Sequence, residues 1–244
     1  MRRHRHRSTE SDTDHRVRLI AETEPRSTAS EAYRTLRTNI QFAGLDQPCR
    51  SILITSTTAG EGKTTTAANL GAVLAQTGSR VCLIDSDLRR PSLHRLFEFE
   101  NDRGLTTALL DDLPFAEVAR PTRVPNLSVL TSGPLPPNPA ELVGSKRMRD
   151  LIEGAASNFD VILCDSPPVL AVSDPIALTT QCDGVLFVVR VNKVPHDIIK
   201  RALGQIEAVK GKILGVLLNY VNPRGHGYRY HYRYYYYEPY ESRQ

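Results

Sequence analysis

The chain has 244 residues with 31 Lys and Arg, 27 Asp and Glu and a formal net charge of +4, an excess too small to require a nucleic-acid partner. This length accommodates one α/β domain with a sizeable core, and the longest apolar run, 185–189, is far shorter than the ~20 residues that span a bilayer. Because of that short run, any membrane role is expected to require a partner. Four cysteines without CxxC or metal-type spacing predict a reduced, cytoplasmic protein.

The two ends of the chain lack the apolar periodicity of a folded domain. Residues 1–28 alternate charge and polarity, which predicts a disordered basic arm. Residues 223–244 are rich in tyrosine and poor in aliphatic side chains, which predicts a flexible tail. The sequence therefore predicts a single folded domain over residues 29–222.

A helix is predicted to open this domain, with Ser30 as its N-cap. Its apolar face follows helical spacing and consists of Tyr33, Leu36 and Ile40. A neighbouring polar face carries Glu31, Arg34 and Arg37. Taken alone, these three charges are typical of solvated i,i+3 pairs on an exposed helix.

Six unbroken apolar runs alternate with helix-like segments through the rest of the domain. They are Ser51–Thr55, Val81–Ile84, Leu127–Leu130, Val161–Cys164, Val185–Val189 and Ile213–Leu218. Such runs are typical of strands buried on both faces, so the sequence predicts an α/β fold with a doubly wound, mostly parallel sheet and helices on both faces. One helix should run from Lys63 to about Gln76 and end at Gly78. The Pro-rich segment 133–139 should be a surface connection into another helix.

A glycine-rich loop, Thr57-Thr-Ala-Gly-Glu-Gly-Lys-Thr64, follows the first apolar run. The amides of such a loop and the N-terminus of the next helix can surround a phosphate, while Lys63 reaches the β/γ oxygens and Thr64 binds magnesium. Thr57 stands where the strict pattern has glycine, so an incidental glycine turn is the alternative. The residues expected to bind the nucleotide here are Gly60, Glu61, Gly62, Lys63, Thr64 and Thr65.

Acidic residues end two further apolar runs. Asp85 and Asp87 follow one run, and Asp165 ends another. Ligands of a parallel α/β sheet bind beyond the carboxyl ends of its strands, so these acids can meet a magnesium-bound triphosphate held by the loop. Each could instead be an ordinary strand-ending aspartate, but the three elements together predict one nucleotide site.

This combination of motifs resembles the bacterial tyrosine kinases (BY-kinases) of capsular and extracellular polysaccharide synthesis over about residues 17–244. The glycine-rich loop is similar to the family's Walker A motif, segment 84–91 to Walker A′ and segment 162–168 to Walker B. Segment 31–37 is similar to the ExxRxxR subunit-contact motif. The resemblance implies a P-loop NTPase of the partitioning-ATPase-like type.

The resemblance also implies roles for individual residues, with ATP and Mg²⁺ as cofactors. Lys63 and Thr64 would bind phosphates and the metal, and Asp87 and Asp165 would hold the metal or its waters. Asp85 is the candidate to accept the tyrosine proton, although which aspartate is the base stays open. Phosphoryl transfer needs mainly positioning and charge neutralisation, which a lysine, a metal and carboxylates supply.

Three further positions bear on the resemblance. Asn219, at the end of the last strand, resembles the adenine-contacting asparagine of related ATPases, and a strand-end cap is the equally open alternative. Ala59 stands where many members have proline, which adds rigidity there rather than a ligand. The family's transmembrane adaptor region is absent, as in members whose kinase and membrane activator are separate chains.

Eight of the ten tyrosines lie in the last seventeen residues. They are Tyr228, Tyr230, Tyr232, Tyr234, Tyr235, Tyr236, Tyr237 and Tyr240. The resemblance implies an autokinase that phosphorylates this cluster in trans and regulates polysaccharide polymerisation or export. Implied partners are a membrane adaptor of the polysaccharide co-polymerase type, a tyrosine phosphatase and other copies in a ring contacting through Glu31, Arg34 and Arg37. Through the adaptor the chain would be recruited to the inner face of the cell membrane.

Two other interpretations use the same residues. A partitioning or septum-positioning ATPase that binds DNA or membrane would share the loop and aspartates, but it would carry a signature lysine where Thr58 stands. The tail, with arginines between its tyrosines, could stack on single-stranded nucleic acid. A non-enzymatic scaffold is disfavoured by the intact Lys63, Thr64 and aspartates. We therefore expect a kinase and do not expect nucleic acid as a partner.

Overall fold

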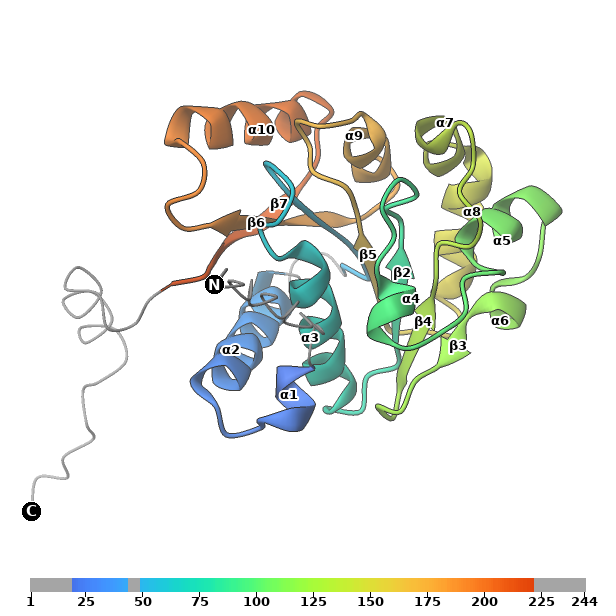
Figure 1. The fold of residues 1–244 in the computed structure, drawn as a ribbon, viewed down its shortest axis with the longest axis horizontal. Helices are drawn as coiled ribbons and strands as arrows, with labels where there is room; N and C mark the ends of the chain where they lie inside the picture. Colours follow the sequence, from blue (N-terminus) through green and yellow to red (C-terminus); the bar gives the residue numbers. More distant parts are fainter. Residues whose placement is uncertain (1–18, 44–48, 222–244) are drawn as a thin grey trace, which may run out of the picture.

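The computed structural model describes residues 19–43 and 49–221, which form a sheet with helices on both faces (Figure 1). These described residues form seven strands, in the sheet order β3-β4-β2-β5-β1-β6-β7. This architecture confirms the predicted fold class. Within the described ranges, no helix combines the length and apolar character needed to cross a bilayer.

All six predicted apolar runs form strands. Among the described residues these strands pair in parallel with their neighbours along the sheet, and the two-residue β3 alone pairs antiparallel, with β4. The strands are β1 Ser51–Ser56, β2 Val81–Asp85, β3 Arg120–Pro121, β4 Leu127–Leu130, β5 Val161–Asp165, β6 Gly184–Arg190 and β7 Ile213–Asn219. The sequence analysis did not predict β3, because two residues are too few to make an apolar run.

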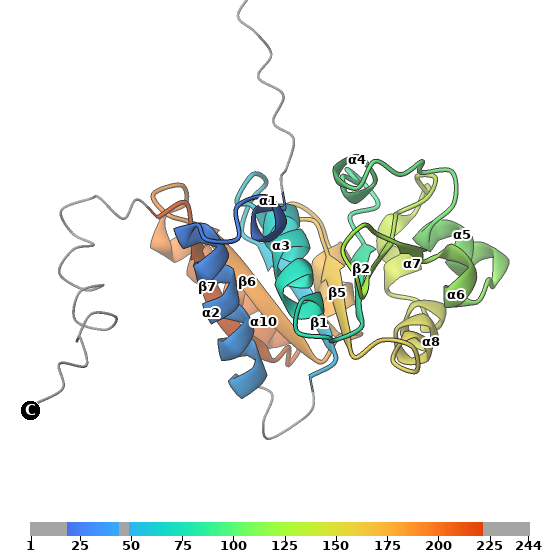
Figure 2. The ribbon, with the colours of Figure 1, turned by 90° about the horizontal axis from the view of Figure 1, so that it is seen from below.

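The helices divide between the two faces (Figures 1 and 2). One face is covered by α1 Ile20–Thr23, α2 Thr28–Ala43 and α3 Lys63–Ala75, with α4 Leu93–Leu96 joining the same core. The core of the other face includes residues of α5 Leu105–Asp111, α6 Phe115–Val118, α7 Pro139–Val143, α8 Lys146–Ala155, α9 Asp174–Thr179 and α10 His196–Ala208. Because α3 lies between the sheet and the α1/α2 pair, it is buried on nearly every side.

The helix predicted to follow an N-cap at Ser30 begins at Thr28, three residues before the predicted start. Ser30 is not its N-cap: the side chain is fully buried, and its Oγ donates to the carbonyl oxygens of Ile20 at 3.1 Å and Glu24 at 2.7 Å. Ser27 takes the capping part, because its Oγ accepts from the main-chain N–H of Ser30 at 3.2 Å. The hydroxyl of Ser30 instead holds α1 against α2.

The predicted boundary at residue 28 is also wrong. Leu19 and Ala21 are 2% and 1% exposed, and α1 packs against α2 and α3. The folded part therefore includes residues 19–28, whose few apolar side chains gave too short a pattern to be recognised. Residues 1–18 of the predicted arm and the whole predicted tail, 223–244, lie outside the described residues.

The last strand departs from the expectation of burial on both faces. Val216 is 46% exposed and Leu218 is 57% exposed on β7. Within the part of the chain that the structure describes, this strand lies at the end of the sheet and pairs with β6 alone. An apolar run in the sequence thus predicted the strand correctly but not its place at an edge.

Sheet register brings the predicted site together. Asp165 is paired in register with Ile54 of β1 on one side and with Asp85 of β2 on the other. The loop after β1 and the acids that end β2 and β5 therefore meet at the same edge of the sheet, as the carboxyl ends of parallel strands must.

Candidate active site

The glycine-rich loop joins β1 to α3 in a conformation that only glycine adopts readily. Gly60 and Gly62 have φ of +71° and +96°, and a Cβ on Gly62 would lie 2.1 Å from Nδ2 of Asn219. No side chain among the described residues caps the N-terminus of α3, where Gly62 is the N-cap. The first amides of α3 are thus oriented for an anion, which the helix dipole also favours.

Lys63 occupies the first position of α3 and is 9% exposed. Burial lowers the pKa of its ammonium, and the charges of Asp165 and Asp87 oppose that change. A cation placed here, with carboxylates near it and anion-binding amides beside it, suits the phosphates of a nucleotide.

The hydroxyl of Thr64 links the loop to the acid of β5. Its Oγ1 donates to Oδ2 of Asp165 at 2.6 Å and accepts from the hydroxyl of Ser92 at 3.3 Å. Asp165 is 1% exposed. Burial raises the pKa of this carboxyl well above its ordinary value, and the neighbouring Asp85 raises it further.

Asp85 is fully buried at the end of β2. Its Oδ2 accepts from the main-chain N–H groups of Ser92 and Leu93, both at 2.9 Å. Burial raises the pKa of Asp85 as well, against the lowering effect of these two hydrogen bonds. The other oxygen, Oδ1, has no hydrogen-bond partner among the described residues, and the same is true of Oδ1 of Asp165.

Two unpartnered carboxylate oxygens beside a threonine hydroxyl form a donor set of hard oxygens. Magnesium prefers such ligands and is commonly held by one or two carboxylates together with substrate phosphates. The residues present therefore fit a magnesium ion next to the loop. An unsatisfied buried carboxylate oxygen is costly without such a partner, which strengthens the fit.

Asp87 lies two residues beyond β2 and is half-buried. Its Oδ1 accepts from the main-chain N–H of Arg89 at 3.2 Å and of Arg90 at 2.9 Å. The guanidinium of Arg89 in turn donates two hydrogen bonds to the carboxylate of Asp174, from Nε to Oδ2 at 2.7 Å and from Nη2 to Oδ1 at 3.3 Å. Asp174, at the start of α9, is 1% exposed. The segment that carries Asp87 is therefore held by its own local hydrogen bonds and by the ion pair of Arg89 with α9.

Glu61 differs from its predicted use as a nucleotide ligand. Its side chain is fully buried, with Oε1 accepting from the N–H and hydroxyl of Thr58 at 2.5 and 3.0 Å, and Oε2 accepting from the N–H of Arg190 at 3.0 Å. The carboxylate holds the shape of the loop, so only the main chain of Glu61 is left to contact a ligand.

Asn219 ends β7, the last strand, as predicted, and its side chain lies against the loop. Its Nδ2 donates to the carbonyl oxygen of Glu61 at 3.0 Å, and its Oδ1 accepts from the N–H of Tyr220 at 2.9 Å. The side chain therefore makes a strand-end cap of the kind weighed as an alternative, beside the nucleotide loop. Thr65 lies in the first turn of α3, half-buried.

The three charged residues of α2 make contacts within the chain. Arg34 pairs with Oε2 of Glu31 at 2.9 Å and donates to the carbonyl oxygen of Pro25 at 2.8 Å. Arg37 donates to the carbonyl oxygen of Val73 on α3 at 3.1 Å. A subunit contact through Glu31 and Arg34 would thus exchange an exposed intrachain pair for an intermolecular one.

Sequence reasoning did not identify Lys193 or Asp174 as parts of this region. Lys193, in the turn after β6, donates to the carbonyl oxygen of Ala59 in the loop. Asp174 begins a helix together with Pro175, so its only sequence signal was that of a helix start. Neither residue is close in sequence to the loop, so no local motif marks them.

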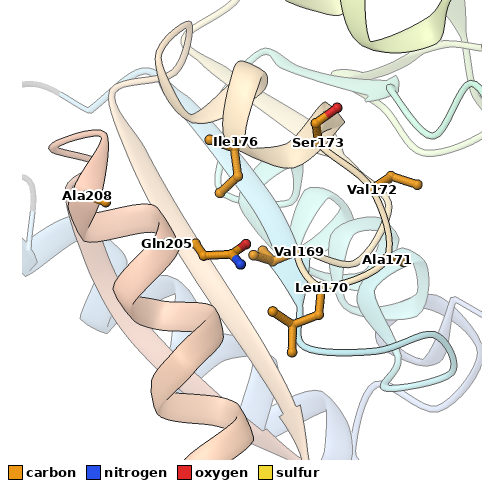
Figure 3. Close-up of a pocket in the computed structure, with 8 residues that line it drawn as sticks. All are labelled: Val169, Leu170, Ala171, Val172, Ser173, Ile176, Gln205 and Ala208. Carbon is orange, nitrogen blue, oxygen red and sulfur yellow. The ribbon is translucent and has the colours of Figure 1, made fainter.

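A separate hollow of about 520 Å³ lies between α10 and the segment from β5 to α9. Figure 3 shows its lining, to which Leu170, Ile176 and Gln205 contribute. Its lining contains no charged residue, so it lacks the chemistry of a phosphate site.

Comparisons with known proteins identify the family to which the chain belongs. Residues 49–217 match the family model described as an AAA domain. The tyrosine-protein kinase YwqD of Bacillus subtilis (strain 168) is 45% identical over 201 residues, which are 82% of this chain and 85% of YwqD. The kinase domain of the Escherichia coli tyrosine kinase ETK is 34% identical, with a TM-score of 0.82 over 85% of this chain and 82% of that one.

The cell division ATPase MinD of Pyrococcus furiosus is 24% identical, with a TM-score of 0.60 over 69% of this chain and 71% of that one. This likeness shows a common fold alone, whereas the matches to YwqD and ETK cover most of each chain at higher identity. The chain therefore belongs to the bacterial tyrosine kinase family, and it is a protein-tyrosine kinase built on a P-loop nucleotide-binding fold.

Proposed function

We propose that this kinase uses Mg·ATP to phosphorylate the tyrosine cluster of its own C-terminal tail in trans, and thereby regulates the polymerisation or export of a capsular or extracellular polysaccharide. The observation that carries the proposal is the convergence of Lys63, Thr64 and two partly unsatisfied buried aspartates at the phosphate loop. The tail supplies eight phenols with no Ala, Val, Leu, Ile or Met after Val221 to bury them.

Each group in the site would do a separate task. The amides at the start of α3 and the ammonium of Lys63 would bind the phosphates. Thr64, Asp165 and Asp85, rather than Asp87, would hold Mg²⁺ or its waters, because the buried carboxylate oxygens left without a partner among the described residues belong to Asp85 and Asp165. The bound ion would neutralise charge on the phosphates. In the transfer the tyrosine oxygen forms a bond to the γ-phosphorus, the bond from that phosphorus to the bridging oxygen breaks, ADP leaves, and the phenol proton passes to a carboxylate.

Burial decides which aspartate is better placed to take that proton. In Asp85 and in Asp87 alike, one oxygen accepts two main-chain hydrogen bonds, but Asp85 is fully buried. Asp87 is half-buried, so a tyrosine from another chain can approach it more easily. We therefore favour Asp87 over Asp85 as the base, and assign Asp85 to shaping the metal site.

The proposed partners follow from the same activity. A membrane adaptor of the polysaccharide co-polymerase type would recruit the kinase from the cytoplasm to the inner face of the membrane, and a tyrosine phosphatase would reverse the modification. Copies of the kinase would contact one another through Glu31, Arg34 and Arg37 and close into a ring, so that one subunit's tail reaches its neighbour's site.

A mixing experiment tests the activity and its direction together. Lys63→Met should keep the fold but lose phosphoryl transfer, because the cation at the phosphates is gone while the loop's main chain is unchanged. The chain with all eight tail tyrosines changed to Phe should keep its active site and serve as the enzyme. Mixed with Mg·ATP, the Phe variant should phosphorylate the tail of the Lys63→Met chain, as measured by mass spectrometry of the tail peptides.

The Lys63→Met chain alone is the control and should stay unmodified. Phosphotyrosine on that chain without the Phe variant would refute the assigned site. Labelling of wild type but not of the mixture would refute transfer in trans.

A further inference from the structure

The turn between β6 and α10 is built against the phosphate loop. The N–H of Arg190 donates to Oε2 of Glu61 at 3.0 Å, and the N–H of Val191 donates to the carbonyl oxygen of Asn219 at 3.0 Å. Asn192 then takes φ of +59°, and the N–H of Lys193 donates back to Arg190 at 3.2 Å. These bonds fix where the main chain of Lys193 leaves the sheet.

The side chain of Lys193 extends from this turn onto the loop. Its ammonium donates to the carbonyl oxygen of Ala59 and lies 3.1 Å from where a Cβ of Gly60 would be. Lys193 is exposed overall, and it enters no ion pair within the described parts of the chain. A neutral carbonyl satisfies one of its three donors, so the ammonium is available for an anion.

A second positive charge already lies in this loop. The pKa of Lys63 is lowered in part by the charge of Lys193, which places the two ammonium groups within electrostatic reach of each other. The two ammonium groups repel each other at this loop. A polyanion bound between them attracts both groups and offsets their repulsion. The phosphates of a nucleotide are such a polyanion.

We propose that Lys193 is a second phosphate-binding lysine of the active site, which leaves the Ala59 carbonyl and pairs with the nucleotide's phosphates when ATP binds. The proposal rests on the proposed nucleotide site and adds a residue to it. A charge here would favour the triphosphate over the diphosphate, because the terminal phosphate adds negative charge beside the loop. It would also stabilise charge on the phosphoryl group during transfer.

A structural role is the competing explanation, in which Lys193 simply clamps the loop through Ala59. The two roles predict different results for Lys193→Met in the full chain. Loss of a clamp would lower the stability of the ligand-free protein and weaken the binding of ATP and ADP equally. Loss of a side chain that binds the phosphates would leave that stability unchanged and weaken the binding of ATP more than that of ADP.

The test measures binding of ADP and of a non-hydrolysable ATP analogue, both with Mg²⁺, by calorimetry. Lys193→Met should lower the affinity for the ATP analogue by about tenfold or more, as expected for the loss of one charge-assisted contact. It should lower the affinity for ADP by clearly less. Lys193→Arg should recover most of the loss, because it keeps the charge. Lys200→Met, which removes an exposed lysine on α10, is the matched control and should bind both nucleotides as the wild type does.

Thermal unfolding and single-turnover transfer complete the test. The ligand-free Lys193→Met protein should unfold at the wild-type temperature, and its transfer rate at saturating ATP should fall by about 10²-fold or more. Equal weakening of both nucleotides with a lower unfolding temperature would overturn the proposal in favour of the clamp, and wild-type binding would overturn it outright. If the wild type itself bound no nucleotide, the proposed function would fail instead.

Discussion

Arg89 places a partly exposed guanidinium on a carboxylate that is almost wholly buried. Its side chain is 41% exposed, whereas that of Asp174 is 1% exposed. Removing the arginine would leave a buried negative charge without its partner, so Arg89→Met should lower the free energy of unfolding by about 1–3 kcal/mol. Arg90→Met removes the next arginine, whose side chain is exposed, and should change it by less than about 0.5 kcal/mol. Urea unfolding of both variants measures the difference, and equal values would show that the pair contributes little.

The buried pair of Asp85 and Asp165 should make the ligand-free protein less stable as the pH rises. Both carboxyls have a folded pKa raised by burial, so the folded state binds more protons than the unfolded state above the ordinary aspartate pKa. Their stabilising effect is complete below that ordinary pKa and is lost as the pH rises through the folded values. Between about pH 5 and pH 8 the loss can reach ~1.4 kcal/mol per pH unit for each proton.

Asp165→Asn should flatten this slope, since an amide at that position does not ionise. Asp160→Asn is the control, because Arg80 holds the pKa of Asp160 at about 2 and its effect on stability is confined to acid. Urea unfolding across the pH range would refute the expectation if the Asp165 and Asp160 variants gave the same slope.

At the scale of elements, the loop and α3 depend on a glycine that has two separate constraints. Gly62 has positive φ and no room for a Cβ beside Asn219, whereas Gly78, after α3, has similar φ with nothing within 4 Å. Gly78→Ala should therefore cost only the strain of the backbone, about 1 kcal/mol. Gly62→Ala should cost more and weaken nucleotide binding, because Asn219 must also move.

The double variant Gly62→Ala with Asn219→Ala separates strain from crowding. If crowding adds to the cost, the second substitution should recover part of the lost unfolding free energy in a double-mutant cycle. Strictly additive effects would show that the amide and the added methyl do not interact.

At the scale of the whole molecule, the expected ring requires that Glu31 and Arg34 exchange partners between subunits. Arg34→Glu and Glu31→Arg should each form smaller particles in light scattering, because every interface then pairs like charges. Mixed in equal amounts, the two variants should recover the wild-type mass, since alternating subunits restore opposite charges at each contact. An unchanged particle mass in the single variants would show that Glu31 and Arg34 form only their intrachain pair on α2 and no subunit contact.

The sequence predicted the sheet and the meeting of the loop with the aspartates because their signals are local. Each apolar run formed a strand, and a loop such as 57–64 carries its chemistry in consecutive residues. The aspartates were recognisable because strand ends in a parallel sheet share one edge. Ser30 was misassigned for the opposite reason, since its partners Ile20 and Glu24 lie in a segment with no periodic pattern.

The sequence by itself determined the fold class, the phosphate loop and the acids that converge on it, because those properties follow from short runs of consecutive residues. Only the tertiary structure decided that the side chain of Glu61 is buried against Arg190, that Asp174 pairs with Arg89 and that Lys193 contacts the loop. Lys193 and Ala59 are 134 residues apart, and Arg89 and Asp174 are 85 apart. Contacts over such separations depend on which strands become neighbours and on how their turns are held, and no local pattern encodes either.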